Sequence, residues 1–227
     1  MDKIRVFVEE GQKKTFVVAI DWPGWARWGK EEPAAFESLL DFAPRYGTVI
    51  EAAGLAFQVP QSMDDFEIIA RGEGNATTSF GAPDILLEEE KLPLSLEEYQ
   101  RSLSILRAAW DEFDQKVDFA WGKELRKGPR GGGRDLEKII THTLQADGAY
   151  LKRLAQKFKF DFDDPLDLQL DQVREAARLA LQAGMDGGIP EKGPRGGKVW
   201  PLRFYIRRAV WHTLDHVWEI EDRIITA

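Results

Sequence analysis

Trp211-His212-Thr213-Leu214-Asp215-His216 is the stretch that decides the fold class of the second half of the chain. It lies inside a long run of helical pattern and holds two of the three histidines among 227 residues. Positions four apart lie one above the other on the same face of a helix, so His212 and His216 can direct two imidazoles at one point. The stretch therefore predicts a helix that carries two metal ligands.

The third histidine, His142, lies in another helical run, Ile139-Ile140-Thr141-His142-Thr143-Leu144. Three imidazoles from facing helices would leave coordination positions open, as in catalytic metal sites. The alternative is that the histidine pair arose by chance and that each imidazole is a hydrogen-bonded core residue. Because the chain uses no histidine elsewhere, the sequence favours a metal site formed by His142, His212 and His216.

Four long runs with helical spacing fill the second part of the chain. They extend from about Leu96 to Trp121, from Asp135 to about Phe158, from Asp164-Pro165 to Gly184, and from Pro201 nearly to the end. Ser95-Leu96-Glu97-Glu98 has the form of a capping box at the first start. Amphipathic helices of this length predict an all-α four-helix bundle over residues 94–227, and bundles build metal sites from side chains that project inward.

Residues 1–93 have a different pattern, which predicts a small α+β unit. Residues 4–8 and 15–20 are rich in β-branched and aromatic side chains and are separated by a polar turn, which predicts a hairpin. Residues 66–71 predict a further strand, and residues 31–53 predict a helix in which Pro44 marks a kink or break. The charged segment that ends at Pro93 predicts the boundary, so the chain is expected to be an α+β protein of two domains.

The acidic charge is concentrated in the first unit. Residues 1–93 contain nine Lys/Arg and seventeen Asp/Glu, whereas the remaining residues contain 22 of each. Nucleic-acid affinity comes largely from clustered Lys/Arg that neutralise phosphates, so the first unit presents the opposite field. We therefore expect no nucleic-acid partner.

Composition also bounds the compartment and the chemistry. With no cysteine, the chain can form neither disulfides nor thiolate ligands, and it has no cysteine nucleophile. The sequence contains no apolar run of about twenty residues that could span a bilayer, and no basic-then-apolar leader. We expect a soluble protein of the cytoplasm without a membrane partner.

A six-residue string occurs twice, before the second and fourth predicted helices. Lys-Gly-Pro-Arg-Gly-Gly occupies residues 127–132 and 192–197. Each copy places an arginine ahead of a helix N-terminus, where backbone amides and the helix dipole favour an anion. Arg130, Arg195 and Arg134 are therefore candidates to hold a carboxylate or phosphate of a substrate. The alternative is that these are matched solvated loops.

Several side chains of the fourth predicted helix share the face that bears the histidines. Tyr205, Arg208, His212 and Glu219 are spaced by three, four and seven residues, so they fall near His216 on the helix surface. Glu219 is a candidate to accept an N–H from a ligand histidine, to serve as a fourth ligand or to take a proton.

Asp215, three residues after His212, competes with Glu219 for the same role. For either carboxylate, the alternative is a surface ion pair with Arg208 or Arg223. The sequence leaves both interpretations open, and Asp215, Glu219, Arg208 and Tyr205 are the candidate catalytic residues.

Residues of about 95–225 resemble the DinB/YfiT-like metal-dependent superfamily, a four-helix bundle with one histidine on its second helix and a His-x-x-x-His pair on its fourth. His142, His212 and His216 fall on those positions. The resemblance implies a divalent metal, zinc or nickel first and manganese or iron next. It also implies a small-molecule substrate, a low-molecular-weight thiol cosubstrate and a homodimer.

The N-terminal unit resembles the HicB-like fold. The shared features are a strand, a Pro-Gly loop and a following helix, here Ala19-Ile20-Asp21-Trp22-Pro23-Gly24-Trp25, Gly29 and the run from Glu31. HicB proteins are antitoxins, but the acidic charge of residues 1–93 argues against DNA regulation.

Together the sequence predicts a metal-dependent transferase or hydrolase. A histidine-bound divalent ion acts as a Lewis acid and can generate a nucleophile from a thiol or from water at neutral pH. The sequence does not choose between thiol transfer and hydrolysis. The alternative is a module that binds a ligand or a protein without catalysis.

Overall fold

The N-terminal part of the chain forms a small four-stranded sheet in the computed structural model, which describes residues 3–128, 133–193 and 196–225. Its strands are β1 (Ile4–Glu10), β2 (Thr15–Ala19), β3 (Ala26–Gly29) and β4 (Phe66–Glu73), in the order β3-β2-β1-β4. The predicted hairpin is confirmed, since β1 pairs antiparallel with β2 and Phe7 lies opposite Val18. β4 pairs parallel with β1.

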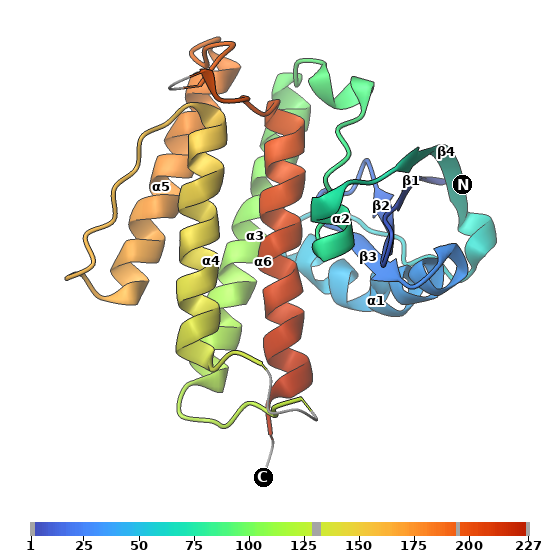
Figure 1. Cartoon of the computed structure of the whole chain (residues 1–227), viewed down its shortest axis with the longest axis horizontal. Helices are drawn as coiled ribbons and strands as arrows, with labels where there is room; N and C mark the ends of the chain where they lie inside the picture. The colour runs from blue at the N-terminus through green and yellow to red at the C-terminus, as the bar shows by residue number, and fades with distance from the viewer. Residues whose placement is uncertain (1–2, 129–132, 194–195, 226–227) are drawn as a thin grey trace. The chain divides into compact units, whose positions relative to one another are not determined.

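Side chains cover both faces of this sheet, which explains why its strands are continuous apolar runs rather than alternating ones. Helix α1 (Glu32–Ala52) contacts β2 and β3 (Figure 1), and Trp25 stacks on Tyr46 of this helix with ring centroids 5.5 Å apart. A kink or break was expected at Pro44; α1 continues through this residue, so the break does not occur. Against the other face, Trp211 packs edge-on against Phe16 with ring centroids 6.1 Å apart.

The remaining elements are helical. Three are short turns of 3-10 helix and one is the short helix α2; they are η1 (Met63–Asp65), α2 (Ala76–Phe80), η2 (Glu88–Lys91) and η3 (Lys152–Leu154). The long ones are α3 (Leu96–Ala120), α4 (Leu136–Leu151), α5 (Leu166–Met185) and α6 (Leu202–Arg223). The expected α+β class is thus confirmed at the level of a small N-terminal sheet followed by a helical region.

The chain divides into two compact units. Unit 1 comprises Met1–Glu88, Gln100–Ala108 and Ile206–Trp211, and unit 2 comprises Glu89–Tyr99, Ala109–Tyr205 and His212–Ala227. Unit 1 therefore contains the sheet together with short segments of α3 and α6. The domain boundary at residue 93 stays a prediction.

Within unit 2, Figure 1 shows α4 and α5 running in the same direction, joined by the crossover segment 155–165. The parts of α3 and α6 that belong to this unit run opposite to α4 (Figure 1). The predicted capping box of α3 is confirmed, because the Glu98 N–H donates to Ser95 Oγ at 3.2 Å and the Ser95 N–H donates to Glu98 Oε2 at 2.7 Å.

The second predicted helix, expected to reach about Phe158, ends at Leu151. Ala155 takes a left-handed conformation with φ of 59°, which terminates the helical turn. Beyond it, the ring of Phe160 lies so close to Gly148 that a Cβ at that glycine would be 2.5 Å from the ring. The helix end is therefore fixed by packing between α4 and the crossover, which local spacing does not reveal. No helix in the described part of the chain combines the length and hydrophobicity needed to cross a bilayer.

Candidate metal centre

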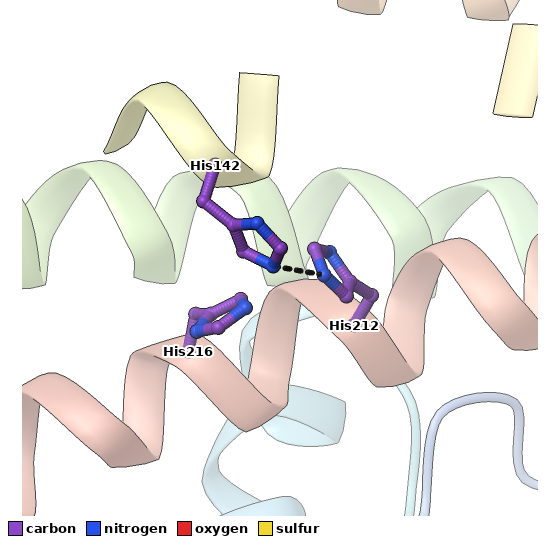
Figure 2. A group of neighbouring side chains, drawn as sticks. All are labelled: His142, His212 and His216. Atoms are coloured by element: carbon purple, nitrogen blue, oxygen red, sulfur yellow. Dashed lines mark hydrogen bonds between the residues drawn. The ribbon is translucent and has the colours of Figure 1, made fainter. Parts of the chain in front are cut away.

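Two helices of unit 2 supply the three histidines. His142 comes from α4, and His212 and His216 come from successive turns of α6. His212 is 8% exposed and His216 is 5% exposed, whereas His142 is half-buried. Figure 2 shows the three imidazoles pointing toward one another from the two helices. The i, i+4 spacing on α6 and the facing position on α4 thus bring the predicted ligands together.

The distances between ring nitrogens fit a shared divalent ion. His142 Nε2 lies 3.2 Å from His212 Nε2 (Figure 2). Two nitrogens held at zinc-ligand distance in a tetrahedron are about 3.3 Å apart. One potential ligand atom from each of the three residues lies within 4.8 Å of the other two. The His142–His212 separation therefore matches that of two ligands of one ion, and the third imidazole lies next to both.

The second nitrogen of His216 is oriented by a carboxylate. His216 Nδ1 lies 2.8 Å from Glu219 Oε2, and an ionised carboxylate can only accept, so Nδ1 carries the proton. Nε2 is then the nitrogen with a free lone pair, and Figure 2 shows it on the side facing the other rings. A carboxylate that fixes the tautomer of a ligand histidine is a regular feature of protein metal sites.

Two pKa shifts favour ligation at neutral pH. Burial first, and then the neighbouring His216 and Arg134 side chains, lower the pKa of His142 to about 4, so the imidazole is neutral at pH 7. Burial alone would raise the pKa of Glu219. The hydrogen bond from His216 and the nearby side chains of His216 and Arg223 outweigh that effect and lower it. A neutral His142 imidazole and an ionised Glu219 carboxylate are forms that suit a bound cation.

The carboxylate candidates differ in their surroundings. Glu219 contacts both His216 and Arg223, so the ion pair considered as an alternative is present together with the histidine contact. Asp215 is half-buried on α6, and the cluster of potential ligand atoms found in the described residues does not include it. Among the proposed roles of Glu219, the geometry matches that of an acceptor for a ligand histidine.

Tyr205 and Arg208 lie on α6 before the histidines. Tyr205 is buried in unit 2, and burial raises the pKa of its phenol well above 10, with the nearby charges of Asp147 and Tyr150 acting in the same direction. Arg208 is buried in unit 1, where its Nη1 donates to the Pro83 carbonyl at 2.8 Å. Their catalytic roles stay predictions.

Of the three candidate anion-binding arginines, the structure describes only Arg134. Arg130 and Arg195 lie outside the described residues. Arg134 is exposed, and its positive charge lowers the pKa of His142 while its backbone carbonyl accepts from Arg223 Nη2 at 2.7 Å. Whether any of them holds a substrate anion stays a prediction.

The sequence did not single out Tyr150, whose ring lies edge-on to His212 with centroids 5.8 Å apart. The ion pair of Glu219 with Arg223, which the sequence offered as an alternative, is present, with Arg223 Nη1 2.5 Å from Glu219 Oε1. Arg223 follows Glu219 by four residues, a spacing at which side chains meet on a helix. Comparison of the chain with protein-family models, with curated proteins and with solved structures gave no match.

Proposed function

We propose that this chain is a metal-dependent enzyme of the DinB-like class, in which His142, His212 and His216 hold a divalent ion. The observation that carries the proposal is the convergence of the three imidazoles from α4 and α6, at nitrogen spacings that suit one shared ion. Imidazole nitrogens select zinc, nickel, iron or copper over magnesium or calcium. Zinc and nickel are the first choices, and manganese and iron the next.

The chain's own residues prepare this site for a cation. Glu219 holds the proton of His216 at Nδ1, and Arg223 keeps the Glu219 carboxylate ionised. The low exposure of His212 and His216 limits competition from water. When bound, a divalent ion supplies Lewis-acid chemistry that generates a nucleophile at neutral pH.

The reaction we propose is either transfer of a low-molecular-weight thiol or hydrolysis. Both need a nucleophile, a thiol or a water, that a histidine-bound divalent ion can activate. Three protein ligands leave coordination positions for substrate, in contrast to the closed set of a structural ion. For residues 1–93, we propose a HicB-like unit. Support comes from the antiparallel β1/β2 pair, the Pro23-Gly24 turn and the helix α1 that follows.

The test is elemental analysis of the purified protein without a histidine tag, alongside His142→Ala. We expect one divalent ion per chain in the wild type and none in the variant. Gln145→Ala is the matched control, because Gln145 is exposed and lies three residues further along the same helix. A wild-type protein that retains no zinc, nickel, manganese or iron after incubation and desalting would overturn the proposal and favour the non-catalytic binding module.

A further inference from the structure

Arg223, at the C-terminal end of α6, donates three side-chain hydrogen bonds to three different parts of unit 2. Nη1 donates to Glu219 Oε1 at 2.5 Å, Nε to the Arg126 carbonyl at 3.0 Å, and Nη2 to the Arg134 carbonyl at 2.7 Å. Its side chain is 15% exposed. A planar guanidinium spreads its donors over three nitrogens in fixed directions and so joins three separated acceptors, whereas an ammonium group presents its donors from a single atom.

The backbone around Arg223 is held by the same segment. The Arg126 N–H donates to the Arg223 carbonyl at 2.6 Å, and the Ile225 N–H donates to the Glu124 carbonyl at 3.1 Å. Leu125 and Ile224 form an antiparallel bridge. The end of α6 is therefore tied by backbone and side chain to the connection between α3 and α4.

Gly133 leaves the space that the Arg223 side chain fills. A Cβ built on Gly133 would lie 2.6 Å from Arg223 Nη2, and the glycine has φ of +117°, which other residues rarely adopt. Gly133 directly follows the first Lys-Gly-Pro-Arg-Gly-Gly string, whereas Lys198 follows the second. The two copies of the repeat thus differ at the position where Arg223 needs room.

These contacts link both helices that supply the histidines. Arg134 immediately precedes Asp135, the N-cap of α4, and α4 carries His142. Glu219 pairs with His216 on α6. We propose that Arg223 is a positioning residue for the metal site, which fixes the start of α4 against the Glu219–His216 pair and so preorganises the three imidazoles.

The expected size of the effect follows from the role of outer partners in metal sites. Residues that orient ligand histidines typically change metal affinity 10- to 100-fold when they are replaced. Without Arg223, Glu219 loses a charged partner and the approach to α4 loses a side-chain anchor at Arg134. Both changes loosen the spacing of His142 and His216, and the cation then has to order them on binding.

The experiment measures zinc affinity by competition with a chromogenic chelator, and records the visible spectrum of the cobalt(II) form. We expect Arg223→Gln to bind zinc about 10- to 100-fold more weakly, with an altered cobalt spectrum. Arg223→Lys keeps a positive charge near Glu219 but loses the two hydrogen bonds from the guanidinium to the Arg126 and Arg134 carbonyls. It should recover part of the affinity, which a residue needed only for folding would not do.

Gly133→Ala provides an independent variant that leaves Arg223 in place. It should push the guanidinium away and weaken zinc binding on the order of tenfold. Gly122→Ala is the matched control, because Gly122 also has a positive φ, of +74°, but has no neighbour within 4 Å of a built Cβ. The control also places an alanine at a positive φ but pushes on no neighbour, and it should bind zinc as the wild type does.

The inference rests on the proposed metal site, and the two fail in different ways. A wild-type protein that binds no zinc would overturn the proposed function. Wild-type affinity in Arg223→Gln, or equal losses in Gly133→Ala and Gly122→Ala, would overturn the positioning role and leave the metal site intact. Equal affinity losses in Arg223→Gln and Arg223→Lys, matched by equal losses in Tm, would also overturn it by showing a structural role alone.

Discussion

The Glu9 carboxylate in unit 1 and the three histidines in unit 2 are both buried ionisable groups, yet their polar atoms are satisfied in opposite ways. Glu9 is fully buried on β1, and its carboxylate accepts from Thr78 Oγ1 and from the backbone N–H groups of Asp84 and Ile85. The two backbone bonds measure 2.8 and 3.0 Å. Its oxygens therefore find donors within the fold of unit 1.

The histidines instead direct ring nitrogens at one another. His142 and His212 approach through their Nε2 atoms at 3.2 Å, although neutral imidazoles each have one nitrogen that can only accept. The supporting contact of the cluster, between His216 and Glu219, lies on the outer nitrogen. A buried group that the chain satisfies itself holds a fold together, whereas the three imidazoles bring one potential ligand atom each within 4.8 Å of the others.

The largest expected effect comes from removing the Glu9 carboxylate, the buried group that the fold satisfies by itself. Glu9→Ala removes the acceptor for Thr78 Oγ1 and for two backbone N–H groups, and it leaves these donors without this partner. We expect the free energy of unfolding to fall by about 3 to 5 kcal/mol. This is less than the sum of three bonds at roughly 1.5 to 3 kcal/mol each, because the Asp84 and Ile85 amides are only partly buried and water can replace the carboxylate there. Urea unfolding in the presence of a chelator measures this loss.

Glu10→Ala is the control for that experiment, because Glu10 is the neighbouring residue and is exposed. A loss in Glu9→Ala no greater than in Glu10→Ala would contradict the structural role of the buried carboxylate. The comparison also requires that zinc leave this difference unchanged, since Glu9 belongs to unit 1 and the histidines belong to unit 2.

The second prediction concerns the three histidines and the effect of removing one of them. A ligand that binds the folded state alone stabilises it by about 2.7 kcal/mol when present at 100 times its Kd. We expect zinc at that concentration to raise the free energy of unfolding of the wild type by this amount, and to leave His212→Ala unaffected. Urea titrations with and without zinc give both values, and an equal zinc increment in the variant would contradict the assignment of His212 as a ligand.

The sequence predicted the histidine cluster because helix spacing is a local property. Once α6 is a helix, His212 and His216 must share a face, and His142 was the remaining partner in the chain. The hairpin of β1 and β2 and the cap of α3 were predictable for the same reason. Each depends on side-chain periodicity or on a box of four residues.

What the sequence did not reveal depends on contacts between distant segments. The spacing on α6 placed Arg208 on the histidine face, but a long side chain can lie either way along the helix, and its guanidinium bonds the Pro83 carbonyl. The four-residue strand β3 was too short to show a clear alternation. The room that Gly133 leaves for Arg223 joins residues 90 positions apart, which no local pattern encodes.

Asp147 on α4 provides a stricter comparison with Glu9, because both are buried carboxylates. Asp147 is 5% exposed, and its Oδ2 has no hydrogen-bond partner in the described part of the chain. Burial raises the pKa of Asp147 to about 7 against the opposing positive charge of Arg174. Without the backbone N–H donors that Glu9 has, the ionised form of Asp147 is costly to bury.

The smallest expected effect sharpens this contrast. The pKa of Asp147 is higher in the folded state than the ordinary value of 3.8, so the folded state retains the proton and loses stability as pH rises from about 4 to about 7. Asp147→Asn cannot ionise. It should therefore match the wild type near pH 4 and exceed its free energy of unfolding by about 2 kcal/mol at pH 8, roughly half of the full linkage value for three pKa units.

The measurement is urea unfolding of the chelator-treated wild type and Asp147→Asn at a series of pH values. His142 titrates in both proteins, so its contribution cancels when the two free energies of unfolding are subtracted. Asp111→Asn, an exposed change on α3, controls for the loss of one negative charge. If the difference between Asp147→Asn and the wild type did not change with pH, Asp147 would have to be satisfied as Glu9 is. The distinction between Glu9, whose carboxylate accepts from backbone N–H groups, and Asp147, whose Oδ2 has no such donor, would then be wrong.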